Sequence, residues 1–198
     1  YPGLTDLYRR TVALVKLSPT DCYLVDCFEV QGGKQHDYFL HGSADEPQTL
    51  TAPADLALQP LPTLLPEGVK FVAGSNEQSS DLTPWHGYGY LRDLKTASPP
   101  AGVTALDYAP EQPGAGLQAF LVTQPGDQLV LGRAPSIRQA QSDDSKLESY
   151  WRQFALLRRQ GGKSLFAAVL APYDAARTIS QVRVVDVPGA RLALEVQS

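Results

Sequence analysis

Strand-length segments separated by glycine and proline turns follow one another along almost the whole chain. Sixteen glycines and sixteen prolines are scattered through its 198 residues, and no internal repeat is present. The β-type runs cover residues 7–17, 22–31, 35–41, 86–97, 103–108, 116–123, 128–133, 150–159, 163–171, 177–187 and 190–196. This spacing predicts an all-β fold, a large antiparallel β-sandwich of stacked sheets with few or no helices. The length fits a single domain over residues 1–198.

Two pairs of adjacent glycines predict two tight hairpins. Glycine adopts the positive φ angles that two-residue hairpin turns require. We therefore expect residues 22–31 to pair with 35–41 across Gly32-Gly33, and residues 150–159 to pair with 163–171 across Gly161-Gly162. Trp151, Phe154, Ala155 and Arg158 also fit helical spacing, but the glycine pair that follows favours a strand. Residues 46–68 contain five prolines and predict a long connection with short strands.

Three further patterns bear on the fold. Residues 69–73 fit a short strand, and residues 136–147 form a polar stretch that predicts a loop. Residues 117–122 and 165–170 are apolar on both faces, which indicates strands that are covered on both sides.

A group of ionisable residues marks the stretch 23–42, YLVDCFEVQGGKQHDYFLHG. His36 falls on the strand face opposite to Asp37 and His41, because successive side chains alternate. One metal ion could therefore not bind both histidines of a regular strand, and a site with His86 would need the fold to bring the residues together. We interpret His36, Asp37 and His41 as structural polar residues within a sheet or at a domain interface.

Asp26 lies in the apolar run 22–31, on the face of Leu24 and Phe28. A buried carboxylate needs an ion pair or hydrogen bonds. We expect Arg9 or Arg10 of the preceding strand to supply them. Asp26 is thus interpreted as structural.

An aromatic group near residue 88 is the second candidate site. Tyr88 and Tyr90 would share one strand face, and Trp85 and Arg92 lie close in sequence. Such residues can form a platform for a sugar ring, since small-molecule sites are often lined by aromatic side chains. Aromatic residues are more often part of the core, so both interpretations stay open.

Two further sets of residues have plain structural interpretations. Cys22 and Cys27 are an odd number of residues apart, which places them on opposite strand faces and predicts two thiols. A second set of basic residues, Arg152, Arg158, Arg159 and Lys163, fits a solvated strand edge better than a site for an anionic polymer.

Composition and motifs exclude several function classes. The formal net charge of −4 argues against a generic nucleic-acid binder. No apolar run approaches the ~20 residues that span a bilayer, so we expect no membrane segment. No nucleophile elbow, phosphate-binding glycine loop, HExxH or CxxC motif is present, which gives no support for an autonomous enzyme. The chain lacks methionine and starts at Tyr1, so we expect a processed chain or a piece of a larger protein.

Residues 1–42, YPGLTDLYRRTVALVKLSPTDCYLVDCFEVQGGKQHDYFLHG, closely resemble heparinase II/III-like polysaccharide lyases. The matching segment follows the catalytic and metal-binding stretch of that family. The pieces PWHGYGYLRDLKTA and FALLRRQGGKSLFAAVLAPY resemble the family's continuation more loosely.

The resemblance implies the C-terminal β-sandwich part of a bacterial, periplasmic or secreted lyase. Such an enzyme has an N-terminal α/α toroid and cleaves an anionic, uronate-containing polysaccharide, of heparan type or alginate, by β-elimination. The family's catalytic residues and metal ligands lie upstream of the segment matched by Tyr1. The resemblance therefore implies no catalytic residue, metal ligand or cofactor in this chain.

Three functions remain open from the sequence. The first is a non-catalytic part of the lyase that supports the toroid and lines the substrate cleft, with His36, Asp37 and His41 bracing the domain interface. The second is a stand-alone carbohydrate-binding module that uses Trp85, Tyr88 and Tyr90. The third, which we favour least, is a complete metal-dependent enzyme.

Overall fold

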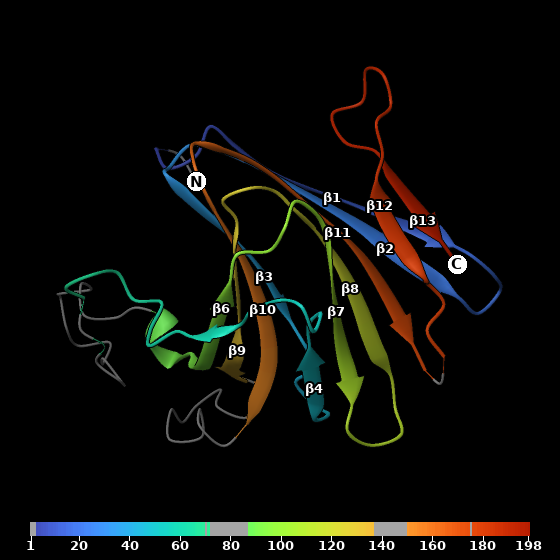
Figure 1. Ribbon diagram of the computed structural model, residues 1–198, viewed down its shortest axis with the longest axis horizontal. Coiled ribbons are helices and arrows are strands. Elements are labelled where there is room, and N and C mark those ends of the chain that lie inside the picture. Colours follow the sequence, from blue (N-terminus) through green and yellow to red (C-terminus); the bar gives the residue numbers. More distant parts are fainter. Residues whose placement is uncertain (1–2, 70, 72–86, 137–149, 175) are drawn as a thin grey trace.

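A computed structural model describes residues 3–69, 71, 87–136, 150–174 and 176–198, and in these ranges the fold is all-β (Figure 1). The antiparallel β-sandwich predicted from the sequence is confirmed. The described residues form one short 3₁₀ helix, η1 (Gly87–Tyr90), and thirteen strands. The strands are β1 (Leu7–Lys16), β2 (Cys22–Gln31), β3 (Gln35–His41), β4 (Gln48–Thr51), β5 (Gln59–Pro60), β6 (Arg92–Ala97), β7 (Gly102–Pro110), β8 (Gly116–Thr123), β9 (Gln128–Pro135), β10 (Trp151–Gln160), β11 (Lys163–Tyr173), β12 (Gln181–Val184) and β13 (Leu194–Gln197).

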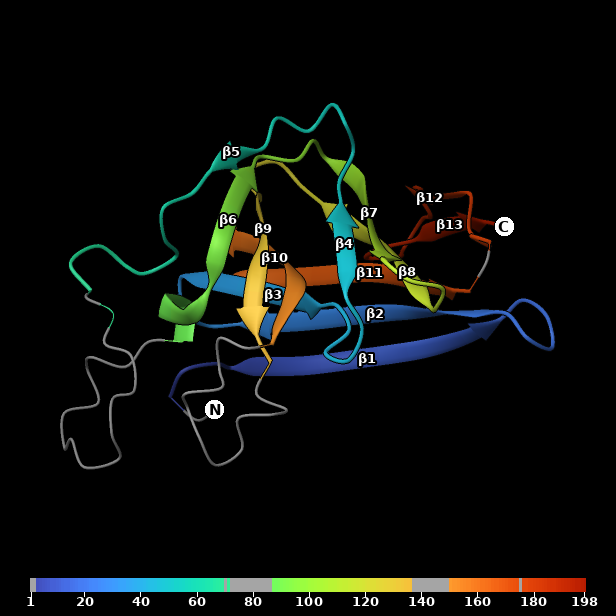
Figure 2. The ribbon, with the colours of Figure 1, turned by 90° about the horizontal axis from the view of Figure 1, so that it is seen from below.

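The strands form three antiparallel sheets (Figure 2). The six-stranded sheet has the order β1-β2-β11-β8-β7-β4, and the five-stranded sheet has the order β3-β10-β9-β6-β5. The main core, which includes Tyr38, Tyr108 and Phe166, lies between these two sheets. A second core lies around Phe154 on the outer face of the five-stranded sheet. The small β12-β13 sheet packs on the outer face of the six-stranded sheet, around Val169.

Strands β8 to β11 are apolar on both faces because both of their faces are covered. Leu156 of β10 belongs to the outer core, whereas its neighbours Ala155 and Leu157 belong to the main core. Side chains of a strand alternate between faces, so only a strand between two apolar layers can bury consecutive residues. The double burial expected for residues 117–122 and 165–170 is largely confirmed, with Leu117, Gln118, Val122, Leu165 and Leu170 only partly buried.

The two predicted glycine hairpins are wrong in their pairing, although the strands and turns exist. Each glycine pair carries the chain from one sheet to the other: β2 pairs with β11, and β3 pairs with β10. The two connections are joined by hydrogen bonds from Gly32 N–H to the Gly162 carbonyl (2.9 Å) and from Gly161 N–H to the Lys34 carbonyl (2.8 Å). Their strands are apolar on both faces, so pairing with strands of two different sheets buries more surface than two local hairpins would.

The segment before β6 also departs from the prediction. Residues 87–90 form η1, and the strand begins only at Arg92. Tyr88 and Tyr90 therefore do not share a strand face. The connection 46–68 contains the short strands β4 and β5, as predicted, whereas β12 and β13 are shorter than expected. Most of residues 69–73 and nearly all of the polar loop predicted at 136–147 lie outside the described residues.

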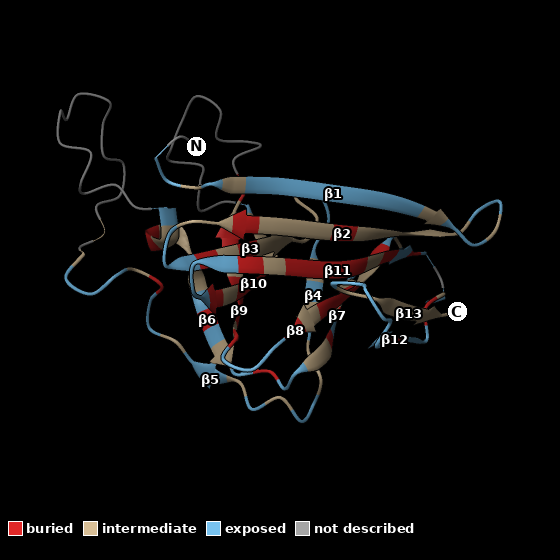
Figure 3. Ribbon diagram, turned by 90° about the horizontal axis from the view of Figure 1, so that it is seen from above, coloured by how far each residue is buried: buried red, intermediate tan, exposed pale blue. Residues whose placement is uncertain are grey.

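The six-stranded sheet extends beyond the five-stranded sheet at β1. Strand β3, the edge of the smaller sheet, reaches the β2-β11 region, where Tyr38 stacks on Phe166 at 5.7 Å between ring centroids. Strand β1 lies one position further out and is exposed along most of its length (Figure 3). The inner side chains of β1 include Val12 and Leu14, which are 54% and 66% exposed. An apolar strip is therefore open on this side of the sandwich.

Candidate functional site

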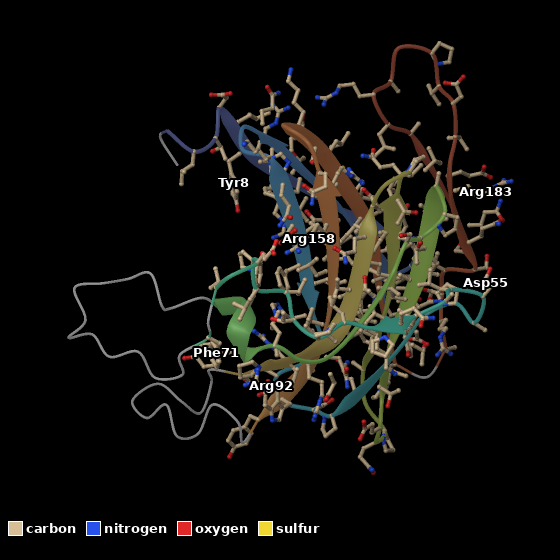
Figure 4. All side chains as sticks on the ribbon, turned by 60° about the vertical axis from the view of Figure 1, so that its left-hand side comes forward. Tyr8, Asp55, Phe71, Arg92, Arg158 and Arg183 are labelled. Atoms are coloured by element: carbon tan, nitrogen blue, oxygen red, sulfur yellow. The ribbon has the colours of Figure 1, made fainter. Side chains whose placement is uncertain are left out.

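A cleft lies where the overhanging β1-β2 pair faces the edge strand β3. Its volume is about 300 Å³. Tyr8 and Phe28 form an edge-to-face pair at 4.8 Å in its wall, and Figure 4 shows the Tyr8 side chain beside the blue strand β1. We call it the open-edge cleft; its lining residues are Tyr8, Arg10, Phe28, Asp37, Tyr38 and Phe39.

Asp26 anchors the first of two polar networks at this cleft. Arg10 donates to it from Nε (2.8 Å) and Nη2 (2.5 Å), and the Tyr38 hydroxyl donates at 2.6 Å. The predicted arginine partner of Asp26 is confirmed as Arg10, whereas Arg9 binds Glu29. Burial raises the pKa of Asp26, but the hydrogen bonds from Arg10 and Tyr38 outweigh it, so the pKa lies below its ordinary value. Asp26 is therefore an ionised carboxylate that fixes Arg10.

Asp37 anchors the second network on the other side of β3. Arg158 donates to its carboxylate from Nε (2.9 Å) and Nη2 (2.8 Å), and the Tyr88 hydroxyl donates to Asp37 as well. Burial and the bond to Asp37 raise the pKa of Tyr88. Burial and Asp26 likewise raise the pKa of Tyr38. Both phenols therefore remain protonated donors at neutral pH, which makes them poor bases.

His36 braces the corner where the chain crosses between the sheets. It is buried, with Nε2 at 2.5 Å from the Gly32 carbonyl and Nδ1 at 2.8 Å from Ser164 Oγ. Because the carbonyl only accepts, Nε2 carries the proton and Ser164 donates to Nδ1. The His36 ring thus bonds to Gly32 and Ser164, away from the strand face of Asp37 and His41, as strand alternation predicted.

His41 lies against aromatic rings on the outer face of the five-stranded sheet. It stacks on Phe39 at 5.4 Å and lies 6.2 Å from Phe154, measured between ring centroids. Burial, together with the charge of Arg152, lowers the pKa of His41 to about 4. The imidazole is therefore neutral at physiological pH.

Replacing His41 by phenylalanine should flatten the dependence of stability on pH. In the unfolded chain His41 titrates near its ordinary pKa of 6.5, whereas in the fold it titrates near 4. The unfolded state thus binds more protons between these values. Because the ring is only partly buried and water screens its charge, the wild type should lose on the order of 1 to 2 kcal/mol as pH falls from about 6.5 to 4. Urea unfolding at several pH values would measure this loss. An equal loss of stability in the His41→Phe variant would contradict the lowered pKa of His41.

Two of the candidate sugar-binding residues, Tyr88 and Arg92, line a second cavity. This cavity of about 360 Å³ is lined in part by Phe71, Tyr88 and Arg92. Tyr90 packs edge-to-face on Phe71 at 4.8 Å, and Arg92 donates to the Gly89 carbonyl at 2.5 Å. Tyr88 joins this cavity to the Asp37 network. Trp85 and His86 lie outside the described residues.

The basic set predicted as a solvated edge is divided between different environments. Strand β10 is an inner strand of its sheet and not an edge. Arg158 and Arg159 are consecutive residues, so their side chains point to opposite faces of this sheet. Arg159 is buried, binds Asp127 at 2.8 and 2.7 Å, and lies 4.6 Å from the Phe166 ring centroid. The solvated-edge interpretation is therefore wrong for both arginines, because each neutralises an aspartate. The cysteines of β2 are free, as predicted.

Sequence reasoning missed most of the cleft. Tyr8 and Phe28 lie in different strands, and the sequence holds no signal that β1 lies outside the cover of the smaller sheet. The sequence predicted Arg10 as a partner of Asp26, but not as a residue of the cleft wall.

No family model matches the chain, and no curated protein matches it. Within the described ranges, no group of three or more His, Cys, Asp or Glu residues is arranged to hold a metal ion. In the same ranges, no helix has the length and apolar character needed to cross a membrane.

Proposed function

We propose that this chain is the non-catalytic β-sandwich part of a polysaccharide lyase that acts by β-elimination on a uronate-containing polysaccharide. In this proposal the chain supports an α/α toroid that carries the reacting groups. The open-edge cleft lines part of the substrate groove. The resemblance of residues 1–42 to heparinase II/III-like lyases supports the class of enzyme.

The observation that carries the proposal is the composition of the open-edge cleft. Aromatic rings such as Tyr8 can stack on a pyranose ring, and Tyr8 is 58% exposed. Asp26 fixes Arg10 through Nε and Nη2, while Nη1 makes no hydrogen bond with the described part of the chain. A guanidinium held in this way has donors left for a uronate carboxylate.

The cleft is better suited to binding than to proton abstraction. β-Elimination needs a base with a pKa near the working pH. The pKa values of Tyr38 and Tyr88 are raised, and that of Asp26 is lowered. In the proposed enzyme, therefore, the proton at C5 is removed by a group outside this cleft, and this chain alone forms no unsaturated uronate.

The Tyr8→Ala variant should bind a uronate oligosaccharide about three- to tenfold more weakly, since roughly 1 kcal/mol of stacking is lost. Calorimetry on the chain measures this directly. Tyr150→Ala is the matched control, because Tyr150 is an exposed tyrosine that does not line the cleft. Equal losses in both variants, or release of an ultraviolet-absorbing product by the chain alone, would refute the proposal.

The same titration separates the lyase domain from a stand-alone carbohydrate-binding module. A module would bind the oligosaccharide as tightly alone as when joined to an α/α toroid. The lyase domain would bind weakly alone and much more tightly in the joined protein, where both walls of the groove are present. Only the joined protein would then cleave the polymer.

A further inference from the structure

A pocket of about 290 Å³ continues the main core to the surface of the sandwich. One wall is formed by β6, β9 and β10 of the five-stranded sheet. The other wall is formed by β4 and the segment that follows it, within residues 50–58. The pocket and the open-edge cleft have no lining residue in common, so they are separate sites.

The floor of the pocket is aliphatic. Leu131 belongs to the main core, and Leu50, Ala52 and Leu58 pack against that core. Among the described residues, no aromatic ring lines the pocket, in contrast to the open-edge cleft. An aliphatic floor offers no partner for the hydroxyl groups of a sugar, and a buried hydroxyl without a partner is costly. The floor therefore fits a hydrocarbon group better than a sugar ring.

Two polar side chains at the pocket have donors to spare. Lys95 of β6 and Gln153 of β10 both line it. Neither the Lys95 ammonium nor the Gln153 side-chain amide forms a hydrogen bond or ion pair with the described part of the chain. An ammonium group has three N–H donors, and a primary amide has two. The two side chains can therefore bind a group that accepts several hydrogen bonds.

A β-bulge shapes the rim of the pocket. Arg92 lies opposite Arg133, whereas Lys95 lies opposite Leu131, so β6 has one residue more than β9 in this interval. Asp93 lies in the bulge with a φ of 53°, in the left-handed region where glycine is the usual residue of a bulge. Bulges and backbone outliers are frequent beside functional sites, where they redirect side chains. The bulge is thus a second feature, independent of the cavity, that marks this place.

The charges of the lining residues leave the pocket with one free cation. Asp93 accepts from Arg133 and neutralises it, and the Arg133 guanidinium also lies 5.3 Å from the centroid of the Trp151 ring. These contacts hold Arg133 at the rim. Among the described lining residues, Lys95 then provides the positive charge that no carboxylate balances.

We propose that this pocket binds a small organic carboxylate with a compact hydrocarbon body. The carboxylate binds to Lys95 and Gln153, and the hydrocarbon body lies on the leucine floor. The volume is at the lower limit for ligand pockets, which fits a body of about one ring. The proposal does not depend on the lyase function, because the open-edge cleft takes no part in it.

An NMR titration of the isotope-labelled chain with cyclohexanecarboxylate tests the ligand class. We expect saturable shift changes at Leu131, Gly132 and Gln153. Cyclohexanecarboxamide has the same body without the charge and should bind about tenfold more weakly. Glucuronate has the carboxylate but a hydroxylated ring, and it should also bind more weakly at this pocket. No saturable change at these residues, or equal affinities for the three compounds, would overturn the proposal.

The Lys95→Met variant tests the role of the ammonium group. It should raise the dissociation constant for cyclohexanecarboxylate about tenfold, because a charge-assisted hydrogen bond is lost. Lys16→Met is the matched control, since Lys16 is exposed on β1 and does not line the pocket. Lys95 is exposed as well, so both variants should fold. Equal dissociation constants for the two variants would contradict the assigned site.

The Ala52→Phe variant tests the floor independently of charge. Its larger side chain would occupy the cavity and should abolish binding of cyclohexanecarboxylate. Binding that survives this change with wild-type affinity would place the ligand outside the pocket and refute the proposal.

Discussion

The Asp127→Ala variant should be less stable than the wild type by about 3 to 5 kcal/mol, the usual cost of breaking a buried ion pair from one side. The side chains of Asp127 and Arg159 are 0% and 5% exposed. Without Asp127, the guanidinium of Arg159 stays in the core beside Phe166, and its one remaining hydrogen-bond acceptor among the described residues is the Leu165 carbonyl. Asp127 also accepts from Gln124 N–H in the turn before β9, and this bond is lost as well. Denaturant unfolding measures the change.

Glu195→Ala provides the matched control for this measurement. Glu195 forms an ion pair with Arg183 in the β12-β13 sheet, where both side chains are largely exposed. Water screens the charges of an exposed pair, so Glu195→Ala should change the free energy of unfolding far less than Asp127→Ala does. Similar losses in the two variants would show that Asp127 and Arg159 are far more hydrated than the structure indicates.

The second large effect is expected from Gly32→Ala at the corner between the sheets. Gly32 has a φ of 102°, and a Cβ at this position would lie 2.8 Å from the Leu4 carbonyl oxygen and 2.9 Å from Thr5 Cα. Backbone strain and a contact with backbone atoms that cannot rotate away together should cost roughly 2 to 5 kcal/mol. The loss should appear in the free energy of unfolding measured with denaturant.

Gly162→Ala tests the same corner without strain. Its φ is outside the left-handed region, and the nearest atom to an added Cβ is the Gly33 carbonyl oxygen at 3.7 Å. We expect little change in stability. If Gly162→Ala lowered stability as much as Gly32→Ala, the corner would tolerate no side chain at either glycine. The loss at Gly32 could then not be attributed to its positive φ and its close backbone contacts.

The fold class was predictable from the sequence because it depends on local patterns. Residues 22–31 and 163–171 alternate or are continuously apolar, and the turns between strands are marked by glycine and proline. Sheet membership was not predictable in the same way. A Gly-Gly turn permits a hairpin and a crossover alike, and the choice depends on which distant strands bury the two apolar faces.

The site was predictable only in its parts. Strand alternation correctly separated His36 from His41, and burial of Asp26 required an arginine partner, which is Arg10. The aromatic wall of the open-edge cleft was not predictable, because it arises where one sheet extends past the other. That overhang depends on the relative width of the two sheets, which no local pattern encodes.

The most direct test of the account is an NMR titration of the isotope-labelled chain with a uronate oligosaccharide. We predict that the largest chemical-shift changes occur at the open-edge cleft, at Tyr8, Arg10, Phe28 and Phe39, and that a neutral oligosaccharide of equal length produces smaller changes at Arg10. Shifts confined to the cavity lined by Phe71 and Arg92, or the absence of shifts at the cleft, would contradict the account.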